Sequence, residues 1–491
     1  MVEMIVGYGH ESRISVYGIL GMGGIGETTL AQKIYNELRI RERFHQEMHR
    51  LKDPDGLELL MKRSFRTRDE ANVFSDIGAK IVKKCDGLPL AIKVVGGVLS
   101  SRSSKEEWER ILERRWSIDG LPEELEGALY LSYSDLPPQL KQCFLWCALL
   151  PQNFNIHRDV TYWWIAEGLV KEECTGPIHN IPEDYYHELI KRNLLQARPE
   201  YVDKGVSTMH DLLTQLGQFL TRNEAVFMNE KRDRCPSSIR RLGVGSAVDE
   251  IPSIEEKKRL RCLIVLHHDT CRSVKRDIFR KLVHLRISVL RGAGLERTPA
   301  SVDYLALLRL LDLSYEIKEL PGSIRNLTSL GCLSVFGCTK LAALPPSLMR
   351  LTTISFLQIG NTGLAQVPKG SSRQRSRRSG SIGAELLGND ILSGTLTTAF
   401  PKLELLEILD MYNWQNWSLS MDTLFDNTQQ QSLMPCLTRL RLINCPKLRA
   451  LPDHLHRIVN LQRIQIEGAD SLQEIIDHPG LCGSRLGTTS P

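Results

Sequence analysis

The sequence lacks the usual marks of a secreted, membrane-spanning or metal-binding protein. No uncharged run approaches the ~18 residues of a membrane span, and residues 1–4 begin no basic region followed by an apolar stretch, so we expect no secretory signal. The 12 cysteines show neither a paired framework nor metal-ligand spacing, which favours a reducing, intracellular compartment. A net charge of +5 is too small to indicate a nucleic-acid or membrane partner by itself.

A glycine-rich loop is the most informative motif that the sequence does contain. Residues 21–29 follow an apolar, strand-like run and precede a helix-like segment. Glycines in this position let backbone N–H groups turn toward an anion at a helix N-terminus. The spacing matches the phosphate-binding pattern G-x-x-x-x-G-K-[ST] except at Glu27, where lysine would reach the β- and γ-phosphates. The alternative is a glycine-rich turn without a ligand.

The sequence after this loop is mostly helix-like. No β-branched strand ending in paired acidic residues follows, as a complete nucleotide-binding sheet would require. From Ala71 the apolar residues recur at helical spacing. Gly87 suits the end of one helix and Pro89 the first turn of the next, which we expect to reach Leu99. His210 precedes another apolar helix, where it would ordinarily lie beside the helix cap.

The order of four segments resembles one protein family. Residues 21–29, 87–91, 143–151 and 209–211 stand in sequence ahead of leucine-rich repeats. In that order they resemble the nucleotide-binding leucine-rich-repeat (NB-ARC) proteins of plant disease resistance, in the form without a TIR domain. The resemblance implies an intracellular receptor that holds ADP at rest and exchanges it for ATP on activation. It places the protein in the cytoplasm, with the nucleus and the plasma-membrane periphery as further locations.

The resemblance also assigns a nucleotide site. The loop amides would hold phosphate, Thr28 would bind Mg²⁺, Pro89 would pack beside adenine, and His210 would contact the β-phosphate of ADP. The expected nucleotide-binding residues are Gly21, Gly23, Gly24, Ile25, Gly26, Glu27, Thr28, Thr29, Pro89 and His210.

The chain departs from the family pattern in its first domain. The second acidic strand and the arginine sensor strand of the family cannot be found. Phe44 is followed almost directly by residues that resemble the segment after those two strands. We likewise expect no amino-terminal coiled-coil domain of the kind found in that family. We therefore expect an internally truncated nucleotide-binding segment that acts as a switch and not as an enzyme, with ATP hydrolysis lost.

The second half consists of repeats. Leucine patterns of the form L-x-x-L-x-L lead to Leu-Pro turns, and Leu442 to Ile466 spans 24 residues, within the ~20–29 of leucine-rich repeats. Each unit gives one strand to a parallel sheet and must stack on its neighbours. A basic insertion at 370–380 breaks this array; it is either a solvated loop or a nuclear-localisation or RNA-contacting segment.

The predicted fold is a multidomain α/β chain with a solenoid. Its parts are a truncated P-loop α/β segment, a helical domain, a winged-helix domain, a connector, leucine-rich repeats and a tail. Their expected boundaries are 1–70, 71–130, 131–225, 226–260, 261–480 and 481–491.

A column of arginines on the last two predicted strands is a candidate partner site. Strand pairing would set Arg439 beside Arg463 and Arg441 beside Gln465, at ~4.8 Å. Like charges this close repel unless an acidic group meets them. We expect Arg439, Arg441 and Arg463 to contribute to a surface for an acidic protein partner; the alternative is a solvated basic patch.

Two functions remain open at this stage. In the first, the chain is an immune receptor, or a fragment of one, that recognises a pathogen effector or a guarded host protein through its repeats. In the second, it is a non-signalling interaction scaffold with a dead nucleotide site. A true ATPase is disfavoured because no catalytic base can be named.

Overall fold

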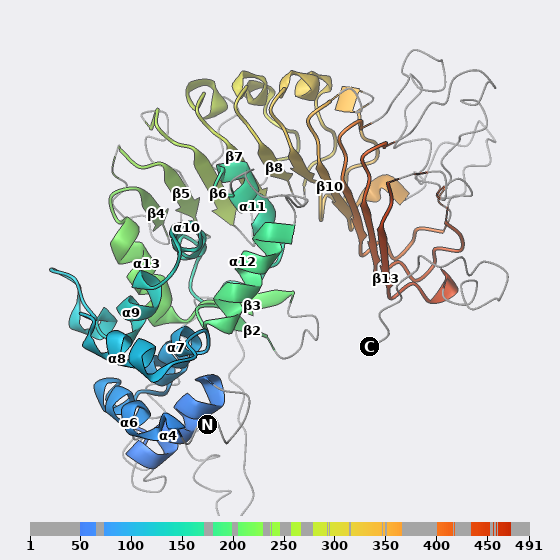
Figure 1. Cartoon of the computed structure of the whole chain (residues 1–491). Coiled ribbons are helices and arrows are strands. Elements are labelled where there is room, and N and C mark those ends of the chain that lie inside the picture. Colours follow the sequence, from blue (N-terminus) through green and yellow to red (C-terminus); the bar gives the residue numbers. More distant parts are fainter. Residues whose placement is uncertain are drawn as a thin grey trace, which may run out of the picture. The chain divides into compact units, whose positions relative to one another are not determined.

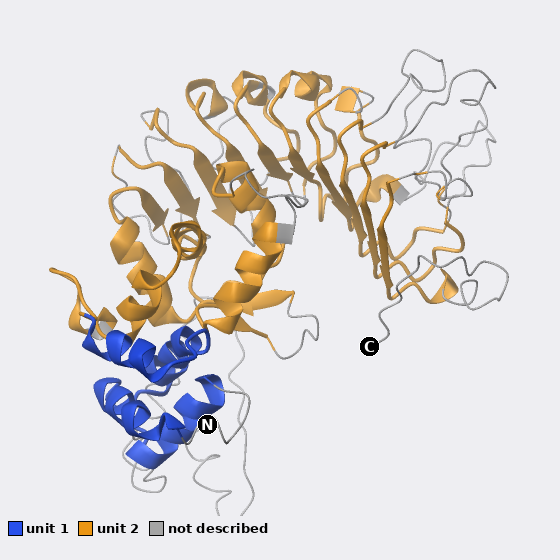
Figure 2. Cartoon of the chain, viewed as in Figure 1, with its two compact units in different colours: residues 1–114 blue, residues 115–491 orange. Residues whose placement is uncertain are grey.

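The computed structural model divides the chain into two compact units, residues 1–114 and 115–491 (Figure 2). The structure describes residues 50–64, 73–170, 180–198, 205–228, 236–245, 257–266, 278–365, 400–417 and 434–472, with residues 237, 292, 294, 314–315, 346, 349–350, 416, 452–454, 456–457 and 459 excepted. The glycine loop at 21–29 and the basic insertion at 370–380 lie outside the described residues.

The first unit is a bundle of helices in its described part. Its helices are α4 (Asp53–Ser64), α6 (Ser75–Lys84), α7 (Pro89–Leu99) and α8 (Lys105–Glu113). As predicted, α7 begins at Pro89, and Gly87 takes a φ of +66° in the preceding turn. A capping box between Ser104 and Glu107 fixes the start of α8.

Helix α4 corrects the expected boundary at residue 70. It packs on α6 and α7, and its Leu60 is fully buried. Gly56 lies so close to Val82 and Ile92 that an added Cβ would clash with Val82. Residues 53–64 therefore belong to the helical bundle and not to the α/β segment in which we had placed them.

The second unit begins with a small helical domain that carries a three-stranded sheet. Its helices are η1 (Glu123–Leu125), α9 (Ala128–Ser134), α10 (Pro138–Cys147), α11 (Val160–Glu167), α12 (Asn180–Lys191) and α13 (Asp211–Thr221). Its strands β1 (Ile156–His157), β3 (Val206–Thr208) and β2 (Gln196–Ala197) pair antiparallel in that order. Trp146, Trp164 and Tyr186 fill its core with no exposure. Helices with a short antiparallel sheet agree with the predicted winged-helix domain.

In the part of the chain that the structure describes, ten parallel strands then follow one another in a single sheet, in chain order (Figure 1). They are β4 (Ala225–Met228), β5 (Arg241–Val244), β6 (Cys262–Leu266), β7 (Ile287–Arg291), β8 (Leu310–Leu313), β9 (Cys332–Ser334), β10 (Phe356–Gly360), β11 (Leu405–Leu409), β12 (Arg439–Ile443) and β13 (Arg463–Glu467). The 3₁₀ helices between them are η3 (Ile278–Lys281), η4 (Ala300–Tyr304), η5 (Gly322–Asn326) and η7 (Gly363–Ala365). The predicted solenoid is confirmed.

One face of every strand supplies the solenoid core. Leu311, Leu333 and Leu357 occupy equivalent places on neighbouring strands and are fully buried in one continuous apolar cluster. Leu442 pairs with Ile466, as the 24-residue recurrence predicts. No single repeat can bury these side chains alone, so stacking is what stabilises the fold.

Two sequence expectations about the repeat array are wrong. The expected connector at 226–260 contains β5 and most of β4, so the sheet starts at Ala225. The insertion at 370–380 does not break the array, because β10 and β11 pair directly, with Phe356 opposite Leu405. A long connection between adjacent strands costs little more than a short one, since loop-closure entropy grows only slowly with length.

Within the described ranges, every helix is too short or too polar to cross a membrane.

Candidate functional site: the concave face of the repeats

The concave face of the sheet is buried along much of its length. Strand residues that point away from the solenoid core face this side, and on β6 to β11 most of them are apolar. Eight of these apolar residues lie outside the core cluster, yet each is at most 4% exposed. These residues are Cys262, Ile264, Ile287, Val289, Leu310, Cys332, Phe356 and Leu405. Another part of the same unit must cover them.

Helix α11 of the winged-helix domain is the cover. It contacts β7 and β8, and the rings of Tyr162 and Phe356 stack with centroids 3.8 Å apart and planes 3° from parallel. On the same helix, Trp163 lies 5.7 Å from the Arg291 guanidinium. Stacking and cation–π contacts each add to the apolar burial.

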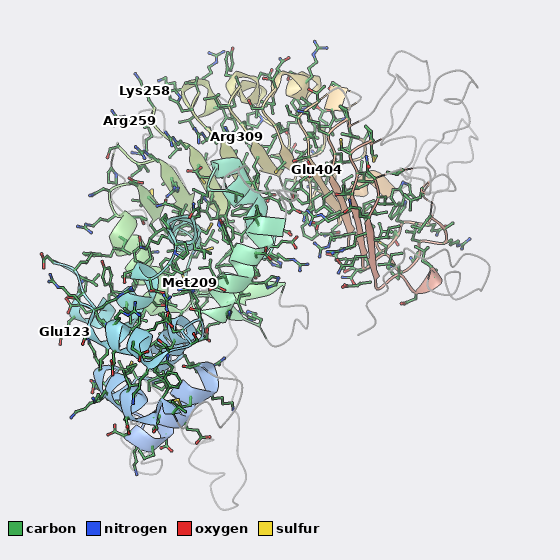
Figure 3. The ribbon with its side chains drawn as sticks, viewed as in Figure 1. Glu123, Met209, Lys258, Arg259, Arg309 and Glu404 are labelled. Atoms are coloured by element: carbon green, nitrogen blue, oxygen red, sulfur yellow. The ribbon has the colours of Figure 1, made fainter. Side chains whose placement is uncertain are left out.

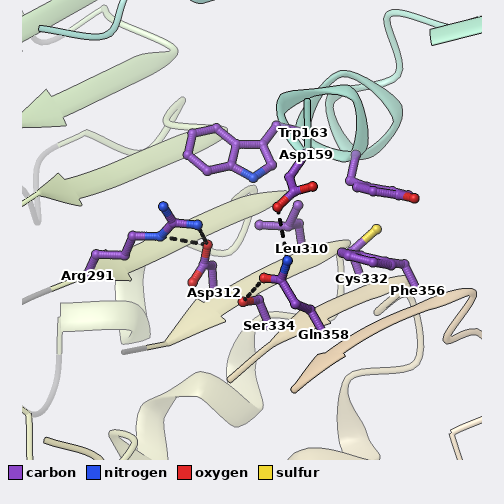
Figure 4. Close-up of a pocket in the computed structure, with 10 residues that line it drawn as sticks. Asp159, Trp163, Arg291, Leu310, Asp312, Cys332, Ser334, Phe356 and Gln358 are labelled. Atoms are coloured by element: carbon purple, nitrogen blue, oxygen red, sulfur yellow. Dashed lines mark hydrogen bonds and ion pairs between the residues drawn. The ribbon is translucent and has the colours of Figure 1, made fainter. Parts of the chain in front are cut away.

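A buried glutamine joins the helix to the sheet (Figure 4). The Gln358 Nε2 donates to Asp159 Oδ2 at 2.9 Å and to Glu407 Oε2 at 3.0 Å. Its Oε1 accepts from the Ser334 hydroxyl at 2.8 Å. Gln358 is 4% exposed. The amide of Gln358 thus makes three hydrogen bonds, and this polar network fixes how α11 lies on the strands.

An ion pair lines the same seam. Arg291 donates to Asp312 Oδ2 from Nε at 3.0 Å and from Nη2 at 2.7 Å. Burial raises the pKa of Asp312, and the Arg291 charge opposes that shift. The cavity among these residues has room for about one water molecule. It is therefore part of the contact between α11 and the sheet and not a small-molecule site.

The structure pairs two of the three predicted partner-binding arginines with acids of the same unit. The predicted register is confirmed, with Arg439 opposite Arg463. Arg439 Nη1 lies 3.0 Å from Glu183 Oε1 on α12, and Arg441 is ion-paired with Glu407. Arg463 is exposed. The acidic groups that offset the charges of Arg439 and Arg441 thus come from the chain itself. The binding of an external acidic partner at this surface stays a prediction.

The predicted nucleotide residues can be placed only in part. Pro89 opens α7 in the first unit. His210 caps α13 in the second unit, where its Nδ1 accepts from the Leu212 N–H at 3.2 Å. This is the helix-cap environment expected of a lone histidine before a helix. The glycine-loop residues, including Glu27 and Thr28, lie outside the described residues. Among the residues the structure describes, no group of three His, Cys, Asp or Glu side chains could hold a metal ion.

The carboxyl of Glu407 should make stability depend on pH. Burial, and after it the Asp159 charge, raises the pKa of Glu407. A raised carboxyl pKa contributes stability that is complete below the unfolded value and is lost as pH rises through the folded value. Over the pH range above about 4.3, the ordinary glutamate value, the stability of the wild type relative to Glu407→Gln should therefore fall as pH rises.

Melting temperatures of the two proteins across this range test the prediction. Glu319→Gln is the matched control, since Glu319 is exposed and pairs with Arg297 on the surface. A wild-type advantage that grows with pH, or one that follows the Glu319 control, contradicts it.

The burial of the concave face has a recognisable signal in the sequence. Strands β6 to β11 each carry apolar residues on both faces, as in Cys262–Leu266 and Leu405–Leu409, whereas in Arg439–Ile443 and Arg463–Glu467 apolar residues alternate with polar ones. Strands buried on both faces read as continuous apolar runs. The change of pattern begins at β12, where the concave-facing residues become partly exposed.

Comparison with known proteins agrees with this architecture. Residues 242–477 match the family described as a leucine-rich repeat region, and residues 149–216 match the winged-helix domain of disease resistance proteins. The chain therefore contains a leucine-rich repeat region and a domain that matches the winged helix of disease resistance proteins.

Its homologues are plant disease-resistance proteins. It is 30% identical to an RPP13-like disease resistance protein of Arabidopsis thaliana over 65% of this chain and 27% of that protein. It is 31% identical to the Arabidopsis disease resistance protein RPP8 over 54% of this chain and 32% of RPP8. It is 29% identical to the RGA1 disease resistance protein of Solanum bulbocastanum over 55% and 26% of the two chains. The chain thus covers about a third or less of the length of these relatives.

Proposed function

We propose that the chain acts as an intracellular plant immune receptor, or as a receptor-derived fragment, of the ADP-binding type. In this proposal the repeats recognise a pathogen effector or a guarded host protein. The observation that carries it is the winged-helix domain of disease-resistance type packed on the concave face of a ten-stranded repeat sheet. Protein recognition is the usual task of such extended solenoid surfaces.

The same arrangement suggests how a nucleotide would act on the repeats. Helix α13 begins at His210 in the domain whose α11 covers the concave face. A nucleotide that contacts His210 would bias the position of this domain, since a ligand shifts an equilibrium through its differential affinity for two states. ATP hydrolysis is not part of the proposal, and the chain would act as a switch.

A non-signalling interaction scaffold is the alternative, and Glu27 is the observation that favours it. A carboxylate in the place of the phosphate-binding lysine repels the anion that the loop would hold. The scaffold would keep its protein-binding repeats and have no use for nucleotide.

Thermal-shift titration of the full chain separates the two functions. A ligand that binds only the folded state raises the melting temperature as its concentration exceeds its Kd. The receptor proposal expects ADP with Mg²⁺ to raise the melting temperature. No shift with either ADP or ATP, at concentrations up to the millimolar range, would leave only the scaffold.

A further inference from the structure

Four arginines occupy the same position in four consecutive repeats. Arg240, Arg261, Arg286 and Arg309 each directly precede a strand, β5 to β8. Their backbones are joined in series, because the N–H of each donates to the carbonyl of the one before it, at 2.7, 2.7 and 2.8 Å for Arg261, Arg286 and Arg309. The first arginine in turn donates to Glu224 at 2.8 Å. We call these four residues the arginine ladder.

The arginine ladder ends at Arg309. After Arg309, the equivalent positions hold Gly331, Ser355 and then Glu404, as the same backbone hydrogen bonds show. Arg309 and Glu404 are both labelled at this edge of the sheet in Figure 3. Positive charge is thus concentrated on four neighbouring strands and absent from the next two. Like charges on directly neighbouring strands destabilise a sheet, so the folded protein alone does not account for the ladder.

Contacts within the unit account for only part of this charge. Arg286 Nη1 donates to the Glu167 carbonyl at the C-terminus of α11 at 3.2 Å, an arrangement that the helix dipole favours. Arg240 lies 3.9 Å from Glu224, and both side chains are about half exposed. Among described residues, no carboxylate pairs with Arg261 or Arg309, and Arg309 is exposed.

We propose that the arginine ladder is a docking surface for an acidic helix of a protein partner. The inference rests on the proposed function, because it names the chemistry of the partner that the repeats would recognise. It also places this surface away from the column of Arg439 and Arg441, whose charges are already met within the unit.

Spacing favours a helix over an extended peptide. Neighbouring strands set the arginines ~4.8 Å apart. Acidic residues three or four apart on a helix lie ~5–6 Å from one another, whereas same-face residues of an extended chain are ~6.8 Å apart. The four arginines span about 14 Å, close to the length of about ten helical residues.

The residue types in this row also argue against single-stranded nucleic acid as the ligand. Proteins that bind such strands combine basic residues with aromatic side chains on which bases stack. Neither the ladder nor the next three positions of its row, Gly331, Ser355 and Glu404, contain an aromatic residue. An acidic protein surface needs only the charges, with guanidinium groups matching carboxylates in two hydrogen bonds.

Fluorescence anisotropy on the full chain tests the proposal. The probe is a labelled helical peptide of about 20 residues with glutamates on one face at every third or fourth position. One comparison peptide has the same charges and prolines at its centre, and a single-stranded RNA of similar charge is the third ligand. The test variant is Arg261→Gln with Arg309→Gln. The control is Arg325→Gln with Arg449→Gln, which removes two exposed arginines elsewhere on the repeats.

We expect the wild type to bind the helical peptide more tightly than the other two ligands at about 50 mM salt. The ladder variant should weaken binding about 5- to 30-fold, and the control should change it less than about twofold. Unchanged melting temperatures would show that the variants fold. If the double variant does not fold, the single variant Arg309→Gln replaces it in the binding measurement.

Three results would overturn the proposal. Equal losses in the ladder and control variants would show that the position of the charges does not matter. Equal affinity for the proline-containing peptide would exclude a helix, and tighter binding of RNA would assign the ladder to nucleic acid. None of these results touches the receptor proposal, which the nucleotide titration tests separately.

Discussion

Replacing Glu27 with lysine should strengthen ADP binding by roughly two orders of magnitude or more. A carboxylate about 4 Å from a phosphate charge costs ~1 kcal/mol in water and ~4 kcal/mol at an effective dielectric near 20. The substitution removes this repulsion and restores the attraction of the lysine found at this place in the phosphate-binding pattern. The wild type should bind ADP weakly and only with Mg²⁺, a cation that Glu27 and Thr28 could share through oxygen ligands.

Calorimetry with ADP and Mg²⁺ on the full chain measures this effect. Glu37→Lys is the matched control, since it makes the same charge change in the helix-like segment after the loop. We expect the control to leave the ADP affinity nearly unchanged and neither protein to hydrolyse ATP. Equal affinities in the wild type and Glu27→Lys would mean that position 27 does not face the phosphates.

Loss of the Arg441 side chain should destabilise the repeat-bearing unit by about 3–5 kcal/mol in Arg441→Leu. Glu407 is fully buried, and Arg441 is its ion-pair partner. Removing one partner of a buried pair leaves a charge without compensation, which costs far more than the pair itself contributes. The double variant Arg441→Leu with Glu407→Leu should recover most of the loss, because no unpaired charge remains.

Urea denaturation of the full chain compares these variants. Arg297→Leu is the control, because Arg297 and Glu319 form an ion pair with side chains 76% and 59% exposed. A pair this exposed contributes at most about 1 kcal/mol. The explanation fails if Arg441→Leu costs no more than Arg297→Leu, or if the double variant is as unstable as the single one.

The solenoid could be predicted from sequence because its signal recurs. The 24-residue recurrence gave the pairing of Leu442 with Ile466, and the structure confirms it. The start of the sheet was not predicted, although Ile239, Leu242 and Val244 follow the L-x-x-L-x-L pattern. A single copy of the pattern beside polar residues is weak evidence for a repeat. All three are fully buried in the solenoid core.

The cover on the concave face could not be read from the repeat pattern alone. Phe356 and Tyr162 are 194 positions apart in the chain, and no local periodicity links them. The doubly apolar strands indicate that something covers the sheet, but not which element. The same limit applies to the arginine column, where the register was predictable and the pairing of Arg439 with Glu183 on α12 was not.

The nucleotide residues show a different limit. The position of Pro89 at the start of a helix follows from its ring and its missing N–H, and the structure confirms that position. The cap at His210 is equally local. Their roles toward ADP come only from the resemblance, and they remain predictions.

If α11 covers the concave face, a cysteine beneath this helix should be protected from reagents in solution. Cys332 faces α11 beside Tyr162 and Trp163, and burial raises the pKa of its thiol to about 12. Cys436 is exposed on the same unit. Only the thiolate is alkylated readily, so cover by α11 should slow the reaction at Cys332.

Mass spectrometry after brief alkylation of the native full chain gives the rate at each cysteine. We predict that Cys436 reacts quickly, that Cys332 stays protected, and that Asp159→Arg with Tyr162→Ala makes Cys332 reactive while the repeats remain folded. Alkylation of Cys332 in the wild type as fast as Cys436 would contradict the account.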